Sequence, residues 1–126
     1  MKAIELAERE MEVMRVLWDR GSATVSEARE LLGDPLAYTT VLTVFRTLEE
    51  KGFVRHEEEG RAYRYYPLIE RDQARSSAVR RLLERAFDGS AELLMTHLVA
   101  ERDLSPAEIR RIKRLLDERL RDGRAT

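Results

Sequence analysis

The 126-residue chain contains no cysteine. This absence excludes disulfides, thiolate zinc sites, iron–sulfur clusters and cysteine nucleophiles. The chain also lacks any apolar run near the roughly 18 residues that a membrane-spanning helix needs. Acidic residues follow too soon after the first methionine for a secretory signal peptide. We therefore expect a soluble protein of the cytoplasm.

Residues that carry enzyme chemistry are scarce. The only two histidines, His56 and His97, lie in segments far apart in the chain. There is no phosphate-binding glycine-rich loop and no nucleophile elbow. We expect no enzymatic activity, no cofactor and no metal site.

Charged residues make up 37% of the chain and hydrophobic residues 43%, which is typical of a helix-rich globular protein. Lys and Arg total 23 and Asp and Glu total 24, so the formal net charge is -1. Residues 1–67 hold 10 basic and 13 acidic residues, a net charge of -3. Because DNA-binding domains are usually basic, any DNA-binding surface here must be local.

Two amphipathic helices are predicted near the N-terminus. The first spans residues 6–20 and ends at Gly21, since apolar residues recur at spacings of three and four. The second begins at the capping box Thr24–Glu27 and ends at Gly33. Its residues expected to face inward are Ala28, Leu31 and Leu32.

Residues 38–51 give conflicting signals. Their threonine, valine and aromatic content favours a strand. The apolar positions Val41, Val44, Phe45 and Leu48 instead follow helical spacing, and Gly52 ends the pattern. We interpret the segment as a helix whose opposite face is polar.

A β-hairpin is predicted next, with strands at 53–56 and 61–67 around a solvated turn at 57–60. Three helices followed by a hairpin is the element order of a winged helix-turn-helix, in which the third helix enters the DNA major groove. Its threonines and arginine can contact base edges and phosphates. The predicted DNA-binding residues are Tyr38, Thr39, Thr40, Leu42, Thr43 and Arg46, with Arg61 and Arg64 on the hairpin.

The second half is purely helical, with helices near 70–88 and 91–101 and a last one started by Ser105 and Pro106. We expect a mainly α protein with a winged-helix domain at 1–68 and a helical dimerisation domain at 69–126. A segment this short buries little core alone, so its apolar stripes favour a twofold dimer over packing on its own first half. The predicted dimer residues are Val79, Leu82, Leu83, Phe87, Leu94, Leu98, Ile109, Ile112 and Leu116.

Five segments resemble the penicillinase repressor family (BlaI/MecI type), and the likeness extends over residues 4–120. The segments are 11–18 (MEVMRVLW), 38–43 (YTTVLT), 48–54 (LEEKGFV), 63–67 (YRYYP) and 101–105 (ERDLS). The resemblance implies a homodimeric winged-helix repressor that binds inverted-repeat operators, often before β-lactam resistance genes. It also implies operator contacts by Thr39, Thr40, Leu42, Thr43 and Arg46, and a membrane-bound sensor-protease as partner.

The chain departs from the family pattern at several positions. Ala7 stands where a capping threonine is common, and Thr47 where an arginine is common. The Asn-Phe pair cleaved in some members corresponds to His97-Leu98, and the cysteine cluster of copper-responsive relatives is missing. Because the pair differs from Asn-Phe, cleavage of this chain at the same position is in question. The missing cysteines exclude copper sensing through a cysteine cluster. A protein-interaction module built on a winged helix is the alternative function, favoured by the acidic first half and by the glutamates at 57–59 of the hairpin.

Overall fold

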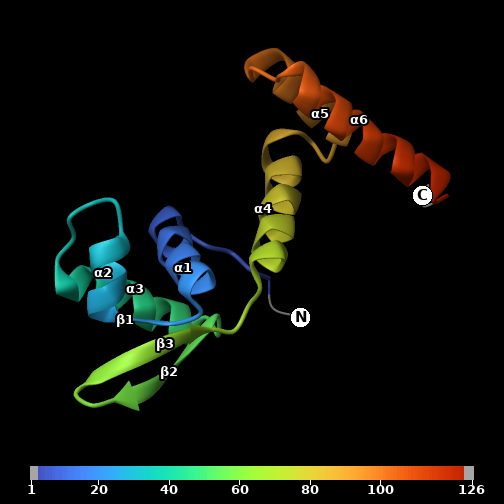
Figure 1. Ribbon diagram of the computed structural model, residues 1–126. Coiled ribbons are helices and arrows are strands. Elements are labelled where there is room, and N and C mark those ends of the chain that lie inside the picture. Colours follow the sequence, from blue (N-terminus) through green and yellow to red (C-terminus); the bar gives the residue numbers. More distant parts are fainter. Residues whose placement is uncertain (1–2, 124–126) are drawn as a thin grey trace. The chain divides into compact units, whose positions relative to one another are not determined.

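The computed structural model describes residues 3–123 and divides the chain into two compact units, residues 1–81 and 82–126. The outer ends of the two predicted domains, residues 1–2 and 124–126, lie outside the described residues. The helices are α1 (Glu8–Arg20), α2 (Val25–Leu31), α3 (Tyr38–Glu50), α4 (Arg71–Ala86), α5 (Ala91–Glu101) and α6 (Pro106–Arg121). The strands are β1 (Ala23–Thr24), β2 (Val54–Glu59) and β3 (Ala62–Pro67) (Figure 1). The expected mainly α architecture with a β-hairpin is confirmed.

The three strands form one antiparallel sheet in the order β1-β3-β2. Tyr65 in the central strand pairs with Ala23 on one side and with His56 on the other. The sequence analysis did not predict β1, because two residues are too few to show strand alternation. Thr24 also caps α2, accepting from the Glu27 backbone N–H at 3.1 Å, so the helix signal masked the strand.

The hairpin of β2 and β3, here called the wing, has longer strands than predicted. Glu57, Glu58 and Glu59 belong to β2, so their assignment to a turn was wrong. The turn consists of Gly60 and Arg61, and Gly60 supplies the positive φ, 62°, that such tight hairpin turns require. Pairing with β3 outweighs the low strand propensity of the three glutamates.

The core of the first unit lies between α1, α3 and β3. The inward face of α3 is as predicted, with Val41, Phe45 and Leu48 fully buried and Val44 partly buried. The Phe45 ring stacks on Tyr65 with 4.3 Å between ring centroids. The helix therefore forms despite its weak propensity because one face buries against the core.

Leu31 was predicted to face inward from α2, and this prediction is wrong. Its side chain is 51% exposed, whereas Ala28 is fully buried and Leu32 packs partly against the core. The helix has only seven residues and ends at Leu31, so its short buried face is completed by Leu32 beyond the helix end.

Ala7 precedes α1 and has no side chain that could cap the helix. The Glu10 carboxylate accepts from the Ala7 backbone N–H at 2.9 Å, and α1 starts at Glu8 rather than at residue 6. Glu10 is 6% exposed and is paired with Lys51 Nζ at 2.7 Å. This partly buried ion pair joins the beginning of α1 to the residue after α3.

The first part of α4 packs within the first unit. Trp18 Nε1 donates to the Ile69 carbonyl oxygen at 2.9 Å, and Ala74 is buried. Ser77 Oγ donates to the Ile4 carbonyl at 2.6 Å, and Arg81 donates to the same oxygen. The compact unit thus extends past residue 68, while the division into functional domains stays a prediction.

The second unit contains α5 and α6, and its side chains remain accessible. Among its described residues, 82–123, none is buried. Ser90 and Ser105 cap the two helices as N-caps, accepting from Leu93 and Glu108 backbone N–H groups. None of the helices in residues 3–123 is long and apolar enough to cross a membrane.

Replacing Phe45 with alanine should lower the free energy of unfolding by about 3–5 kcal/mol, because it empties a buried ring site against Tyr65. Denaturant unfolding followed by circular dichroism measures this loss. The control Leu31→Ala, at an exposed apolar position, should change stability by less than about 0.5 kcal/mol. Equal losses of unfolding free energy for the two variants would contradict the assignment of Phe45 to the buried core.

Candidate nucleic-acid interface

The outer face of α3 carries most of the residues predicted to contact DNA. Tyr38, Thr39, Thr40, Thr43 and Arg46 are exposed on this helix. Leu42 is half-buried and packs partly against the core, so it stands at the edge of that face. The fold therefore brings the six predicted α3 residues onto one helix whose other face is anchored in the core.

The beginning of α3 offers unpaired backbone donors. Ala37 precedes the helix and has no side chain to cap it. The first helical bonds run from the N–H groups of Thr40 and Val41 to the Ala37 carbonyl, at 3.1 and 3.2 Å. The N–H groups of Tyr38 and Thr39 donate to no described residue. Such uncapped donors at a positive helix end suit a phosphate group.

Thr43 and Arg46 differ in which of their hydrogen-bonding groups remain available for a ligand. The Thr43 hydroxyl donates to the Thr39 carbonyl at 2.9 Å. It therefore offers oxygen lone pairs and a methyl group outward, but no proton. Arg46 forms no hydrogen bond or ion pair with a described residue, so its five N–H donors are available for a base edge or a phosphate.

Carboxylates occur on α3 only at its end, at Glu49 and Glu50, although residues 1–67 are acidic overall. No Asp or Glu occurs from Tyr38 to Leu48. Several acidic residues elsewhere are already in ion pairs, including Glu10 with Lys51 and Glu27 with Arg64. The part of α3 that carries the predicted contacts, residues 38–46, therefore has no negative side chain, whereas the wing carries three glutamates.

Arg64 on β3 was predicted to reach DNA, but its donors are occupied within the protein. Nη1 and Nη2 bind the Glu27 carboxylate at 3.0 and 3.1 Å, and Nε and Nη2 bind Glu59 at 2.9 Å each. Nη1 also donates to Ser22 Oγ at 3.2 Å. These bonds use all five guanidinium N–H groups and tie the wing to α2. A DNA contact by Arg64 stays a prediction and would require breaking some of them.

This arrangement shifts the ionisation of the three groups in consistent directions. The hydrogen bonds from Arg64 lower the pKa of Glu27 and of Glu59 below the ordinary 4.5. The same bonds raise the pKa of Arg64. All three groups stay charged at neutral pH.

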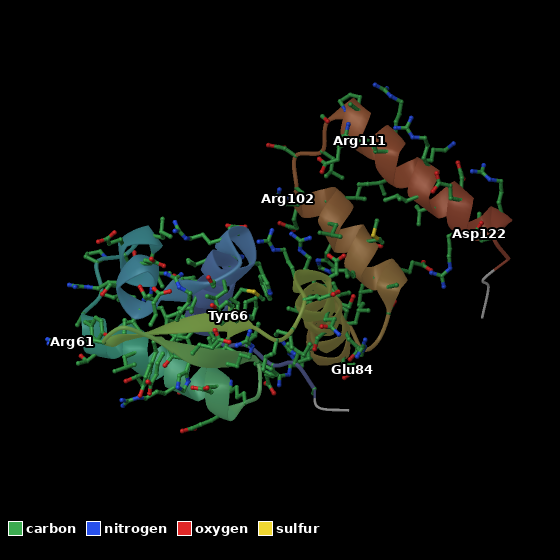
Figure 2. The ribbon with its side chains drawn as sticks, turned by 60° about the horizontal axis from the view of Figure 1, so that its bottom comes forward. Arg61, Tyr66, Glu84, Arg102, Arg111 and Asp122 are labelled. Atoms are coloured by element: carbon green, nitrogen blue, oxygen red, sulfur yellow. The ribbon has the colours of Figure 1, made fainter. Side chains whose placement is uncertain are left out.

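Arg61 lies at the tip of the wing (Figure 2). It is exposed and forms no hydrogen bond or ion pair with a described residue. Because it stands in the two-residue turn, it is the wing cation most available for a phosphate.

A cluster that the sequence analysis missed supports the wing against α3. His56 stacks on Tyr63 with ring centroids 4.3 Å apart, and its Nδ1 lies 2.7 Å from a Glu49 carboxylate oxygen. Tyr65 is buried, whereas Tyr63 is 44% exposed. No spacing rule links Glu49 at the end of a helix to a strand residue. Among residues 3–123, no group of three or more potential ligands could hold a metal ion.

Eight of the nine predicted dimer residues lie on α4, α5 and α6, and Phe87 directly follows α4. All nine are exposed or half-buried in the single chain. Val79, Leu82, Leu98, Ile109 and Leu116 are 40–55% exposed. Leu83, Phe87, Leu94 and Ile112 are half-buried. None of the nine side chains is fully buried, so the single chain leaves part of their apolar surface exposed to solvent.

Acid should unfold the protein partly through the Arg64 cluster. Since the pKa values of Glu27 and Glu59 are lowered on folding, their contribution is present above pH 4.5 and is lost as the pH falls below it. Thermal unfolding of Arg64→Gln should therefore depend less on pH in this range than that of the wild type. The control Arg55→Gln breaks a wing pair with Glu57 at 2.9 Å and should keep the wild-type pH profile. Parallel profiles for wild type and Arg64→Gln would contradict this role.

Comparison with known proteins agrees with this geometry. The chain is 36% identical to the transcriptional regulator BlaI of Mycobacterium tuberculosis over 78% of this chain and 74% of that protein. It is 27% identical to the penicillinase repressor of Bacillus licheniformis over 94% of each chain. The solution structure of the DNA-binding domain of the repressor BlaI matches with a TM-score of 0.52 and 30% identity, covering 57% of this chain and 90% of that domain.

The match to a family model extends over nearly the whole sequence. The model described as penicillinase repressor matches residues 6–118, which include the wing, α3 and the C-terminal helices. The resemblance found in the sequence segments is confirmed, as is the winged-helix fold. The chain belongs to the penicillinase repressor family.

Proposed function

We propose that this protein is a sequence-specific DNA-binding transcriptional repressor that inserts α3 into the major groove of an operator. The observation that carries this proposal is the exposed α3 face, which combines threonines, a free arginine and unpaired backbone donors, with no carboxylate before Glu49. Thr is a poor helix former, so a run of exposed threonines costs helix stability and is best explained by a binding role.

Each residue on this surface has a distinct proposed role. Thr39, Thr40, Leu42 and Thr43 contact base edges, and the outward methyl group of Thr43 suits a thymine methyl. Arg46 binds a guanine edge or a phosphate with two N–H groups. The backbone N–H groups of Tyr38 and Thr39 and the side chain of Arg61 bind phosphates. These groups offer few phosphate contacts, so binding should depend only moderately on salt.

Family membership supports a repressor rather than an enzyme. The relatives are named as repressors and regulators, and one related structure is named a DNA-binding domain. A protein-interaction module remains the competing function. The wing glutamates that favoured it are partly accounted for, since Glu57 and Glu59 are paired with Arg55 and Arg64.

We also propose that the repressor acts as a homodimer on an inverted repeat. In support, the second unit has no buried residue among those described, and its helices expose leucine, isoleucine and valine side chains. Burial against a second copy would remove this apolar surface from water. A twofold pair would also place two α3 helices on successive turns of the duplex.

Two further proposals concern the cellular setting. We propose that the protein works in the cytoplasm, because a repressor must reach the DNA that it regulates. The family resemblance suggests a membrane sensor-protease as the releasing partner. His97-Leu98, at the position matching the family's cleaved Asn-Phe pair, lies within helix α5, so cleavage there would first require local unfolding.

Binding to duplexes selected from a random pool tests the repressor function. Specific duplexes should bind more tightly than random ones, and Arg46→Ala should weaken specific binding by about 1–3 kcal/mol because a base or phosphate contact is lost. The control Arg80→Ala, an exposed arginine on α4, should bind like the wild type. Equal affinity of the wild type for selected and random duplexes would favour the interaction module instead.

The dimer is tested in the full chain by Leu116→Glu, which places a charge on an exposed apolar position of α6. Sedimentation should show a monomer at concentrations where the wild type is a dimer, since a buried unpaired charge opposes association. Affinity for a duplex with two half-sites should fall, and affinity for a single half-site should not. The control Arg111→Glu changes an exposed polar position on the same helix (Figure 2). Dimeric Leu116→Glu would contradict the interface.

A further inference from the structure

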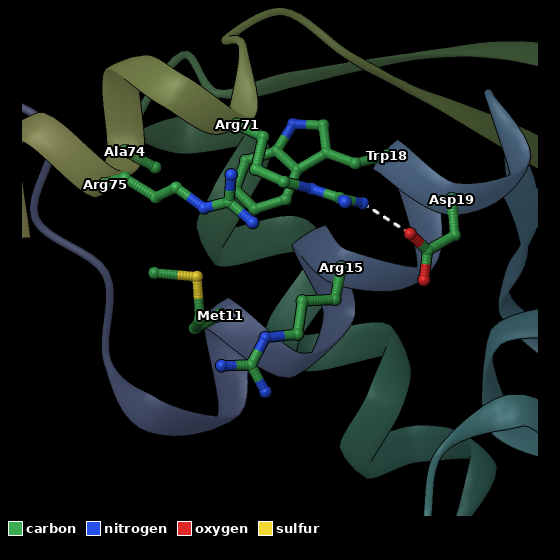
Figure 3. A pocket seen from close by; sticks show the side chains of 7 residues that line it. All are labelled: Met11, Arg15, Trp18, Asp19, Arg71, Ala74 and Arg75. Carbon is green, nitrogen blue, oxygen red and sulfur yellow. Dashed lines mark hydrogen bonds and ion pairs between the residues drawn. The ribbon is translucent and has the colours of Figure 1, made fainter. Parts of the chain in front are cut away.

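A cavity of about 310 Å³ lies between α1 and the first turns of α4, within the first unit (Figure 3). Its volume is at the lower end of the range typical of small-molecule sites, roughly 300–1,000 Å³. The lining residues are Met11, Arg15, Trp18 and Asp19 from α1 and Arg71, Ala74 and Arg75 from α4. None of them belongs to the proposed DNA-binding surface.

The cavity carries an excess of positive charge. Three arginines face one carboxylate, and Figure 3 shows Arg71 and Arg75 extending from α4 toward α1. Arg71 is paired with Asp19. Arg15 has no partner among the described residues, and Arg75 has only a long, exposed contact of 3.4 Å with Asp72. Two guanidinium groups are therefore available for an anion.

The third arginine, Arg71, is not fully satisfied by its pair with Asp19. Arg71 Nε is buried, and it donates to no described residue. A buried donor without a partner is costly in free energy. Because this nitrogen has no accessible surface, the guanidinium groups that an anion can reach are those of the exposed Arg15 and Arg75.

The remaining wall is apolar and aromatic. Trp18 spends its only donor, Nε1, on the Ile69 carbonyl, and the Arg71 guanidinium lies over its ring, 5.6 Å from the ring centroid. The ring can therefore offer a ligand only the part that Arg71 leaves open. Met11 is half-buried and Ala74 is buried beside it. A flat apolar group can lie against the open part of the indole and contact the methionine sulfur.

We propose that this cavity binds a small aromatic carboxylate, whose carboxylate is held by Arg15 and Arg75 and whose ring lies against Trp18. Guanidinium groups bind carboxylates through paired hydrogen bonds. Such a ligand joins α1 to α4, the helix that continues from the first unit into the second. It is therefore placed to act as an effector of the repressor.

Trp18 is the only tryptophan of the chain, so its fluorescence reports on this cavity directly. The full-length protein is titrated with benzoate, with the uncharged benzyl alcohol and with inorganic phosphate, at constant ionic strength. Benzoate should change the emission saturably. The other two compounds should bind at least about tenfold more weakly, because benzyl alcohol lacks the carboxylate and phosphate lacks the aromatic ring. An equal response to benzyl alcohol or to phosphate would overturn the proposal, as would the absence of a saturable benzoate response.

Variants separate this site from general charge attraction. Arg75→Gln and Arg15→Gln change exposed side chains and should each weaken benzoate binding at least about fivefold, with little change in thermal stability. The matched control Arg80→Gln removes a charge from α4 outside this cavity and should leave binding unchanged. Equal weakening by Arg75→Gln and Arg80→Gln would show nonspecific attraction and overturn the proposal.

Discussion

The buried stack of Phe45 on Tyr65 is the contact on which the rest of the first unit depends. Phe45 belongs to α3 and Tyr65 to the central strand of the sheet, so the stack fixes the rotation of the proposed recognition helix relative to the wing. Because every third or fourth α3 residue is held in the core, the residues between them are held outward. The proposed DNA-binding face is thus a direct consequence of core packing.

Electrostatic pairing explains how an acidic first half can carry a surface for an acidic ligand. Carboxylates are drawn into local pairs, as with Glu10 at Lys51 and Glu27 at Arg64. The cations left unpaired include Arg46 on α3 and Arg61 on the wing, where a phosphate backbone would lie. Net charge over a whole domain is therefore a weaker guide to DNA binding than the distribution of unpaired cations.

Much of this architecture could be predicted from sequence because the signals were local. Capping by Thr24 and Ser105 and the periodicity at Val41, Phe45 and Leu48 gave the helices, and the fold class and family are confirmed. The missed features are nonlocal. Strand β1, the pairing of the wing glutamates and the saturation of Arg64 depend on residues brought together by folding, which no spacing in the chain reveals. Leu31 was misplaced because periodicity assumes a helix that continues beyond it.

The continuity of α4 has a mechanical consequence. Its 16 residues form one uninterrupted helix about 24 Å long, and its first turns are fixed to α1 by the Ala74 packing and the bonds of Ser77 and Arg81 to Ile4. A rigid rod held at one end behaves as a lever. Small rotations at the base of α4 therefore become larger displacements at its last turn, which ends at Ala86.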